Sequence, residues 1–462
     1  MAKKLWGGRF KKRTDPDFER FSSSYRWDGR LLPYDLKIDA AHVRALKKCG
    51  VLSAGEATRL LSAVTLLKRR YEKGALKLNP AAEDVHSVIQ AELEKLTGPL
   101  ADKLHTARSR NDLVSQSSRL YCLDHSRRLL HLVRALQKEA VRKADQYKNV
   151  LVPGMTHLQN AQILSQGHIF LAYAEMLERA AFRLEGAIVI CDVCVLGSGA
   201  LAGVTFPLDQ KMIARELGLS KITSNSYDAV GERDFIVNLV SSILLLGTSL
   251  SRIAEDLLIA QVRGVKLIEI DEAFCTGSSM MPQKKNADFL ELVRGAAGIF
   301  FGNFIGMLTT VKGLPTSYNR DLQWDKKFLF DSVENSEEIL GIFIKVFRTL
   351  KVNEAEAKRL LADDTLYATD LADSLVKKGV PFKLAHEQVG RIVSFAEERG
   401  LPVSSIGLDL IRKIAPKADG GLYGLFDPVH SISLKRTAGS THPAQIKNQI
   451  RVWKKKLNNA PV

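Results

Sequence analysis

The chain is poor in aromatic residues and shows no regular punctuation by glycine and proline. Aromatic side chains make up 7% of the 462 residues, whereas 45% are hydrophobic and 26% are charged. Leu, Ala, Glu, Lys and Arg are plentiful, and these residues favour helix over strand. Glycine and proline gather at a few junctions, which argues against an all-β protein. The sequence therefore predicts a mostly α-helical globular protein, and its length predicts two or three domains.

Cysteine is also scarce, with five residues scattered along the chain. This odd number argues against a disulfide framework and for a reducing compartment. Cys191 and Cys194 form a C-x-x-C, but no second pair or histidine cluster accompanies them. Two small buried side chains are therefore a better account than a zinc site. The N-terminus has no apolar segment of the kind found in secretory signals, so we expect a cytoplasmic protein.

The net charge of +16 raises the question of a nucleic-acid or acidic-lipid partner. Lysine and arginine are, however, spread along the whole chain, and no basic stripe is interleaved with aromatic residues. We therefore expect a solvated basic surface that helps to attract a polyanionic substrate, and no nucleic-acid partner. The uncharged segment 235–250 is shorter than the ~20 residues of a membrane span, so we expect a buried helix and no membrane association.

Hydrophobic periodicity predicts helices along most of the chain. Shorter helices are expected near residues 34–48, 55–73 and 83–96, and five long helices at about 112–147, 161–192, 234–262, 287–311 and 324–350. Helices of roughly 25 to 35 residues extend ~40–50 Å, so their apolar faces are expected to pack in a bundle and against sister chains. Three domains follow: a mostly helical N-terminal domain (1–110), a central long-helix bundle (111–352) and a small helical C-terminal domain (353–462).

Three polar features are candidate functional sites. The run His105 to Asp112 precedes a long helix and combines arginines, hydroxyls and an amide, which suits either a carboxylate clamp or a helix cap formed by Asn111 or Asp112. The Pro-Gly pair at 153–154 marks a turn that places His157 near the mouth of the next helix, in a catalytic or a structural role. His86 lies near the start of another helix, and its role is likewise either catalytic or structural.

The most specific segment is residues 277–286, Gly-Ser-Ser-Met-Met-Pro-Gln-Lys-Lys-Asn. A Gly-Ser-Ser loop that leads into a helix brings backbone N–H groups and the positive helix end close to two hydroxyls and Lys284. This arrangement suits the stabilisation of negative charge next to a bound carboxylate, whereas an isolated Gly-Ser-Ser would more simply be a solvated loop. The whole segment resembles the signature loop of the fumarase, aspartase and argininosuccinate lyase superfamily, Gly-Ser-Ser-x-Met-Pro-x-Lys-x-Asn.

Further motifs narrow this resemblance to the argininosuccinate lyase family along essentially the full length. They are residues 4–10, 105–112, 156–159, 313–315, 318–323 and 368–372. The resemblance implies a three-domain, mostly α lyase fold and a homotetramer in which three subunits build each active site. It also implies the anti-elimination of argininosuccinate to fumarate and L-arginine, as in arginine biosynthesis or the urea cycle, with no metal or redox cofactor.

The same resemblance assigns roles by position in the motifs. Ser278 corresponds to the proton-abstracting serine, His157 to the acid-side histidine and Glu291 to its carboxylate partner. Lys284 and Asn286 correspond to groups that hold the succinyl carboxylate and the carbanion. The remaining substrate contacts that it implies are Ser24, His86, Arg110, Asn111, Thr156, Ser279, Tyr318, Gln323 and Lys326.

Two alternatives to this activity stay open at the level of the sequence. A sister lyase that releases fumarate, such as adenylosuccinate lyase or aspartase, shares the signature loop. A non-catalytic structural protein on the same scaffold, like the lens crystallins related to this family, is the other. The intact Ser278, His157, Lys284 and Glu291 argue against the second alternative.

Overall fold

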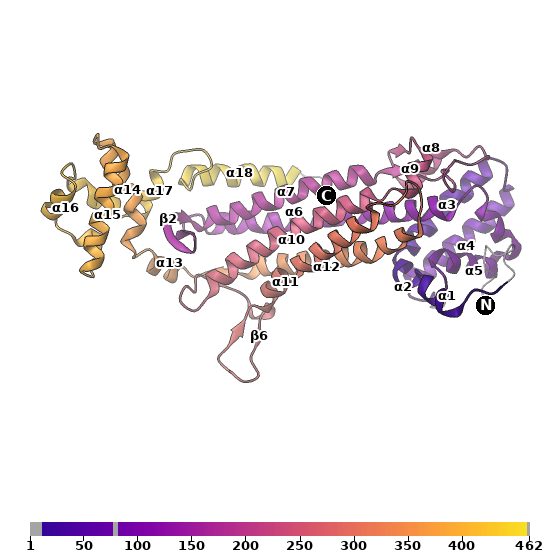
Figure 1. Cartoon of the computed structure of the whole chain (residues 1–462), viewed down its shortest axis with the longest axis horizontal. Coiled ribbons are helices and arrows are strands. Elements are labelled where there is room, and N and C mark those ends of the chain that lie inside the picture. Colours follow the sequence, from indigo (N-terminus) through magenta and orange to yellow (C-terminus); the bar gives the residue numbers. More distant parts are fainter. Residues whose placement is uncertain (1–11, 77–81, 460–462) are drawn as a thin grey trace. The chain divides into compact units, whose positions relative to one another are not determined.

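The computed structural model of the protein describes residues 12–76 and 82–459, and it is predominantly α-helical, as the composition predicted (Figure 1). The motif at residues 4–10 lies outside the described residues. The chain divides into two compact units. Unit 1 comprises Met1–Leu130, Phe182–Gly247 and Ala296–Glu337, and unit 2 comprises His131–Ala181, Thr248–Gly295 and Glu338–Val462.

Five long helices confirm the bundle that the periodicity predicted. They are α6 (Arg110–Gln146), α7 (Gln166–Cys191), α10 (Asp234–Gln261), α11 (Asp288–Val311) and α12 (Asp325–Thr349). Each of these helices contributes one end to unit 1 and the other end to unit 2. The three consecutive domains with boundaries at 110 and 352 stay a prediction, because the two units describe a different division of the chain.

Unit 1 adds shorter helices to the ends of the long ones. They are α1 (Pro16–Ser22), α2 (Tyr25–Asp28), α3 (Leu32–Lys48), α4 (Ala54–Glu72), α5 (Val85–Thr97), α8 (Gln210–Leu217) and α9 (Ser226–Gly231), with 3-10 helices at Gly29–Leu31, Gly98–His105 and Arg320–Trp324. The two-residue strands β3 (Val193–Cys194) and β4 (Lys221–Ile222) pair in parallel. Local sequence sets several of these boundaries: Ser53 and Glu56 form a reciprocal capping box that starts α4.

Unit 2 contains the C-terminal helices and three small antiparallel strand pairs. The helices are α13 (Glu354–Leu360), α14 (Ala368–Lys377), α15 (Phe382–Glu398), α16 (Leu408–Ile414), α17 (Pro428–Ser433) and α18 (Pro443–Asn459), with 3-10 helices at Glu272–Phe274, Asp364–Tyr367, Val403–Ser405 and Gly420–Leu425. The strands pair as β1 (Leu151–Thr156) with β2 (Gln159–Ser165), β5 (Ile268–Glu269) with β8 (Lys351–Val352), and β6 (Thr276–Gly277) with β7 (Lys285–Asn286). A separate apolar core, including Leu375, Ile392 and Ile411, lies among α14, α15 and α16.

The predicted helix start at 161 is wrong, because residue 161 lies in β2, and so is the predicted turn at Pro153 and Gly154. Both residues lie inside β1, where a Cβ on Gly154 would approach Leu164 Cδ1 to 2.6 Å. The turn is formed instead by His157 and Leu158, with φ of +55° and +60°. Two consecutive left-handed residues are the backbone of a type I′ hairpin turn, which the sequence did not reveal because Asn and Gly usually occupy it.

Two helices, α10 and α11, are long and apolar enough to cross a membrane when only length and composition are considered, in a search limited to the described residues. Half of the most apolar window of α10 is buried inside the protein, but only 22% of that of α11. The buried side of α10 fits the core helix that the sequence predicted. Most of the apolar window of α11 is exposed, so packing within one chain does not account for its apolar side chains.

Candidate active site

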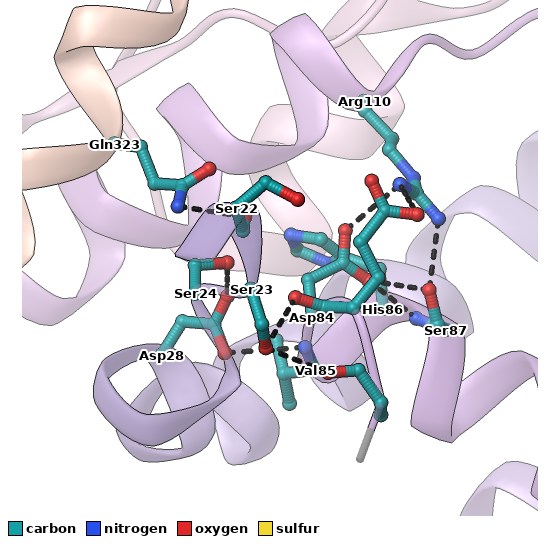
Figure 2. A network of polar contacts seen from close by, with 12 residues as sticks. Ser22, Ser23, Ser24, Asp28, Asp84, Val85, His86, Ser87, Arg110 and Gln323 are labelled. Atoms are coloured by element: carbon teal, nitrogen blue, oxygen red, sulfur yellow. Dashed lines mark hydrogen bonds and ion pairs between the residues drawn. The ribbon is translucent and has the colours of Figure 1, made fainter. Parts of the chain in front are cut away.

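In unit 1, Ser24 belongs to a buried polar network that joins α2 to the start of α5 (Figure 2). Its Oγ donates a hydrogen bond of 2.6 Å to Asp28 Oδ2, and the N–H of Val85 donates to Asp28 Oδ1 at 3.2 Å. Burial raises the pKa of Asp28 to about 6, although His86 and Ser24 act in the opposite direction. The carboxylate therefore fixes the Ser24 hydroxyl while carrying a charge that burial makes costly.

The guanidinium of Arg110 lies at the other side of this network (Figure 2). It contacts Asp84 Oδ2 at 2.9 Å, and it donates to Ser87 Oγ at 2.9 Å. Asp84 is also the N-cap of α5, because its Oδ1 accepts from the N–H of Ser87 at 2.8 Å. Burial opposes ionisation of Asp84, but His86 and Arg110 outweigh it and lower the pKa of the carboxyl. Arg110 is thus held in place while part of its side chain stays accessible, as a substrate clamp requires.

The segment from Tyr318 to Lys326 reaches the same region. Gln323 Nε2 donates to the carbonyl of Ser22 at 3.0 Å (Figure 2). Lys326 is buried and pairs with Asp325 at 3.0 Å, and Asp325 also accepts from Arg233 Nε at 2.9 Å. Tyr318 is half-buried. The structure therefore brings Ser24, Arg110 and Gln323 into one part of unit 1.

Asn111 lies beside a tight glycine loop. Its Nδ2 donates to the carbonyl of Ala200 at 3.0 Å. Helix α6 begins at Arg110, and the N–H of Asn111 donates to Ser109 Oγ at 3.2 Å, while Asp112 Oδ1 accepts from the N–H of Ser109 at 2.9 Å. Ser109 is therefore the capping residue, which corrects the expectation that Asn111 or Asp112 would be the N-cap. The side-chain amide of Asn111 therefore does not cap α6.

His86, the remaining predicted contact in unit 1, is 5% exposed. Its Nδ1 lies 2.5 Å from Oδ2 of Asp35, a buried carboxylate on α3. His86 lies behind Asp28 and Asp84, the residues that hold Ser24 and Arg110 (Figure 2).

The signature loop in unit 2 connects β6 to β7. Thr276 pairs with Asn286 and Gly277 with Lys285, so the loop 278–284 is closed at its base by a short hairpin. Ser279 and Lys284 are exposed, whereas Ser278 and Asn286 are half-buried. Ser278 Oγ accepts from the N–H of Met281 at 3.0 Å and is approached by that of Met280 at 3.3 Å. The loop thus directs two backbone donors at the serine oxygen.

The other predicted catalytic groups of unit 2 lie at exposed positions. Thr156 ends β1, and His157 occupies the tip of the hairpin with its backbone in the left-handed region. Glu291 lies in the first turn of α11 and is exposed. Among the described residues, no hydrogen bond or ion pair joins His157 to Glu291. The hairpin and the helix therefore present these side chains outward.

The sequence-predicted residues fall into two sets, one in each unit. The acidic partners in unit 1 were not predicted, because Asp28, Asp35 and Asp84 carry no motif of their own. One signal was present: Asp84 immediately precedes an amphipathic helix, which is typical of an N-cap. Within the two described ranges, no group of three or more His, Cys, Asp or Glu side chains is arranged to hold a metal ion.

Comparisons with known proteins agree on one family. The family model described as "Lyase" matches residues 8–302, and the one described as "Argininosuccinate lyase C-terminal" matches residues 365–433. The argininosuccinate lyase of Bacillus licheniformis is 40% identical over 457 residues, covering 99% of this chain and 100% of that protein. That of a Geobacillus species is 39% identical and covers 99% of each. A crystal structure of EDDS lyase in complex with formate superposes with a TM-score of 0.82 at 26% identity, over 97% of this chain and 91% of that one.

Proposed function

The chain belongs to the argininosuccinate lyase family, and from this membership we propose that it cleaves argininosuccinate into fumarate and L-arginine by anti-elimination. Such a reaction removes a proton from the carbon next to a carboxylate and breaks the bond to a nitrogen. It needs a base, a pocket that stabilises the carbanion, and an acid for the leaving nitrogen. The observation that carries the proposal is the 40% identity to an argininosuccinate lyase over 99% of the chain.

Ser278 is the base in this proposal. A serine alkoxide is costly to form unless donors surround its oxygen. The backbone N–H groups of Met280 and Met281 already point at Ser278 Oγ, and Lys284 adds positive charge from the same loop. Lys284 and Asn286 then hold the succinyl carboxylate and the carbanion, next to Ser279. Closure of the loop over the substrate would exclude water and strengthen these interactions.

His157, paired with Glu291, is the acid for the leaving nitrogen, with Thr156 contacting the substrate beside it. Because both side chains are exposed, we assign their pairing to the assembled oligomer, a homotetramer in which three subunits contribute to each site. The large apolar side chains exposed on α11 support such an assembly, since side chains of this kind are normally covered at an interface. They are Leu292, Ile299, Phe301, Ile305 and Leu308.

The residues of unit 1 bind the rest of the substrate. Arg110 and Asn111 hold carboxylates beside Ser24, and Tyr318, Gln323 and Lys326 contact the arginine end. His86 supports this set. Apart from the hydroxyls of Ser24 and Tyr318, the side chains of this set are positively charged or carry N–H groups, which matches a substrate that is rich in carboxylates.

We also propose that the enzyme acts in the cytoplasm, in arginine biosynthesis or the urea cycle, without a cofactor, nucleic acid or membrane partner. All five cysteines are free thiols, in keeping with a reducing compartment. The exposed face of α11 is assigned to contacts with sister chains and not to lipid.

A substrate panel tests the activity. The purified protein is mixed with argininosuccinate, adenylosuccinate or aspartate, and ultraviolet absorbance follows the fumarate released. We expect a rise with argininosuccinate. A rise with only one of the other substrates would favour a sister lyase, and a folded tetramer that releases no fumarate from any of them would favour a structural protein.

A further inference from the structure

A fully buried acid–imidazole pair lies behind the substrate-binding residues of unit 1. Asp35 on α3 is 1% exposed and His86 on α5 is 5% exposed, and 2.5 Å separates Asp35 Oδ2 from His86 Nδ1. The other oxygen of Asp35 accepts a short hydrogen bond from Ser117 of α6. Asp35 is therefore fixed from one side by α6, and its charge faces the imidazole of α5.

His86 differs from two other imidazoles in this part of unit 1, the buried His42 and the half-buried His105. Burial by itself lowers the pKa of His86, but Asp35, followed by Asp84 and Asp28, outweighs burial and raises it. Burial, assisted by Arg108, lowers the pKa of His42 to about 3 and that of His105 to about 4. His86 is thus the one of these three whose surroundings favour the positively charged imidazolium.

This cation lies between two carboxylates that repel each other. Asp28 and Asp84 each hold one substrate-binding side chain, Ser24 and Arg110 respectively. The charge of Asp84 raises the pKa of Asp28, and the charge of His86 lowers the pKa of both acids. A positive charge at this position therefore lets the two acids stay ionised side by side, in the orientations that Figure 2 shows.

We propose that Asp35 is a positioning residue for substrate binding: it holds His86 as a cation in one orientation, and His86 in turn holds Asp28 and Asp84. Asp84 then presents Arg110 to a carboxylate of the substrate, and Asp28 fixes Ser24 beside it. The inference rests on the proposed function. Neither Asp35 nor His86 needs to touch the substrate, since each is more than nine-tenths buried.

The substitution Asp35→Asn in the full-length enzyme tests this role, because asparagine keeps the size of the side chain and its contact with Ser117 but removes the charge. We expect the KM for argininosuccinate to rise about tenfold, with kcat changed less than about threefold. The pH dependence of KM should also change. Without the Asp35 charge, His86 loses its proton at a lower pH than it does in the wild type, so the rise of KM with increasing pH should begin at a lower pH in the variant. The other charged or titratable groups near His86 are Asp28, Asp39, Asp84, His105 and Arg108, and Lys326 acts on Asp28.

Asp39→Asn is the matched control. Asp39 lies one turn further along α3, is equally buried, and pairs with Arg108 at 2.5 Å. Its loss removes a buried ion pair but leaves the contact between Asp35 and His86 in place, so it should lower stability and change KM much less than Asp35→Asn does. The double variant Asp35→Asn/His86→Asn should have the KM of the His86→Asn single variant, since Asp35 acts through His86. An unchanged KM in Asp35→Asn, an equal KM rise in Asp39→Asn, or fully additive effects would overturn the proposal.

Carbon-13 NMR of labelled histidine gives a readout that does not depend on turnover, with His86→Asn used for assignment. The proposal predicts that Asp35→Asn lowers the pKa of His86, because the negative charge that favours the imidazolium is gone. If that pKa does not move, the inference fails, even in an active enzyme. If the wild type releases no fumarate while the pKa does move, it is the proposed function that fails. Should Asp35→Asn not fold, Asp35→Glu keeps the charge on a longer side chain and should give an intermediate KM.

Discussion

The backbone N–H of Met281 donates a hydrogen bond to Ser278 Oγ at 3.0 Å. The serine that the family resemblance assigns as the base therefore has a donor directed at its oxygen before any substrate is bound. Donors that are fixed in advance stabilise a developing oxyanion without reorganisation during the reaction. This contact is formed within the loop itself, three residues apart in sequence.

The first prediction concerns that serine. Ser278→Ala removes the oxygen that takes the proton, and we expect kcat to fall by at least ~100-fold at an intact fold. Ser405→Ala is the control and should retain full activity; this exposed serine ends a 3-10 helix, and its Oγ donates to the carbonyl of Pro402. Steady-state fumarate release measures both. A near-normal rate in Ser278→Ala would remove this residue from the mechanism.

The hairpin tip gives the second prediction. His157→Asn removes the acid but suits the left-handed backbone, because asparagine tolerates positive φ. We expect a loss of at least ~100-fold in kcat with an unchanged melting temperature. Leu158→Asn, at the neighbouring left-handed position, is the control for the turn and should keep turnover. Equal losses in both variants would indicate that the turn, and not the imidazole, matters.

The third prediction is a pH dependence. Burial raises the pKa of Asp28 to about 6, so this carboxyl takes up a proton as the pH falls through 6 and no longer accepts from both Ser24 and Val85. We expect the KM of the wild type to rise as the pH falls from 7 to 5. In Asp28→Asn the KM should be high and flat over the same range. A KM profile in the variant that still bends near pH 6 would assign the dependence to another group.

The same shift has a consequence for stability. A carboxyl whose pKa is raised in the folded state binds protons more tightly when folded than when unfolded. Its contribution to stability is therefore present below its unfolded pKa and is lost as the pH rises to about 6. Burial raises the pKa of Asp112 to about 6 as well, so the melting temperatures of Asp28→Asn and Asp112→Asn should vary less than that of the wild type between pH 4 and 6.

The fourth prediction concerns assembly. Phe301 on α11 and Phe382 on α15 are equally exposed, at 58% each. Phe301→Glu places a charge in the proposed interface and should dissociate the tetramer and abolish turnover. Phe382→Glu should leave both unchanged. Sedimentation velocity combined with the fumarate assay separates these outcomes, and a fully active tetramer of Phe301→Glu would argue against the α11 interface.

The long helices could be predicted from the sequence because their apolar residues recur at the helical period over many turns. The hairpin β1–β2 could not, since its turn uses His157 and Leu158, which have no turn preference, while the Pro153-Gly154 signal lies within a strand. The capping residue of α6 was misassigned because Ser109, Asn111 and Asp112 are all good N-caps, and only the backbone geometry distinguishes them.

Candidate site residues could be named from the sequence only where they belong to a recognisable motif. The resemblance assigns roles to the signature loop and the hairpin residues, which stay predictions, but it did not indicate the acids that hold Ser24 and Arg110. Asp35 and His86 are 51 positions apart, and nothing in either segment indicates that α3 and α5 bring them to 2.5 Å. Pairings of this kind arise from packing between helices, which periodicity predicts in general but not residue by residue.

The central claim is that side chains from separate copies of the chain form one catalytic site, and a mixing experiment tests it most directly. Ser278→Ala and His157→Asn tetramers are dissociated together, reassembled and assayed with argininosuccinate. If the serine and the histidine of one site come from different subunits, some sites in the hybrids receive both intact residues, and fumarate release returns. Hybrids as inactive as either parent would contradict the claim.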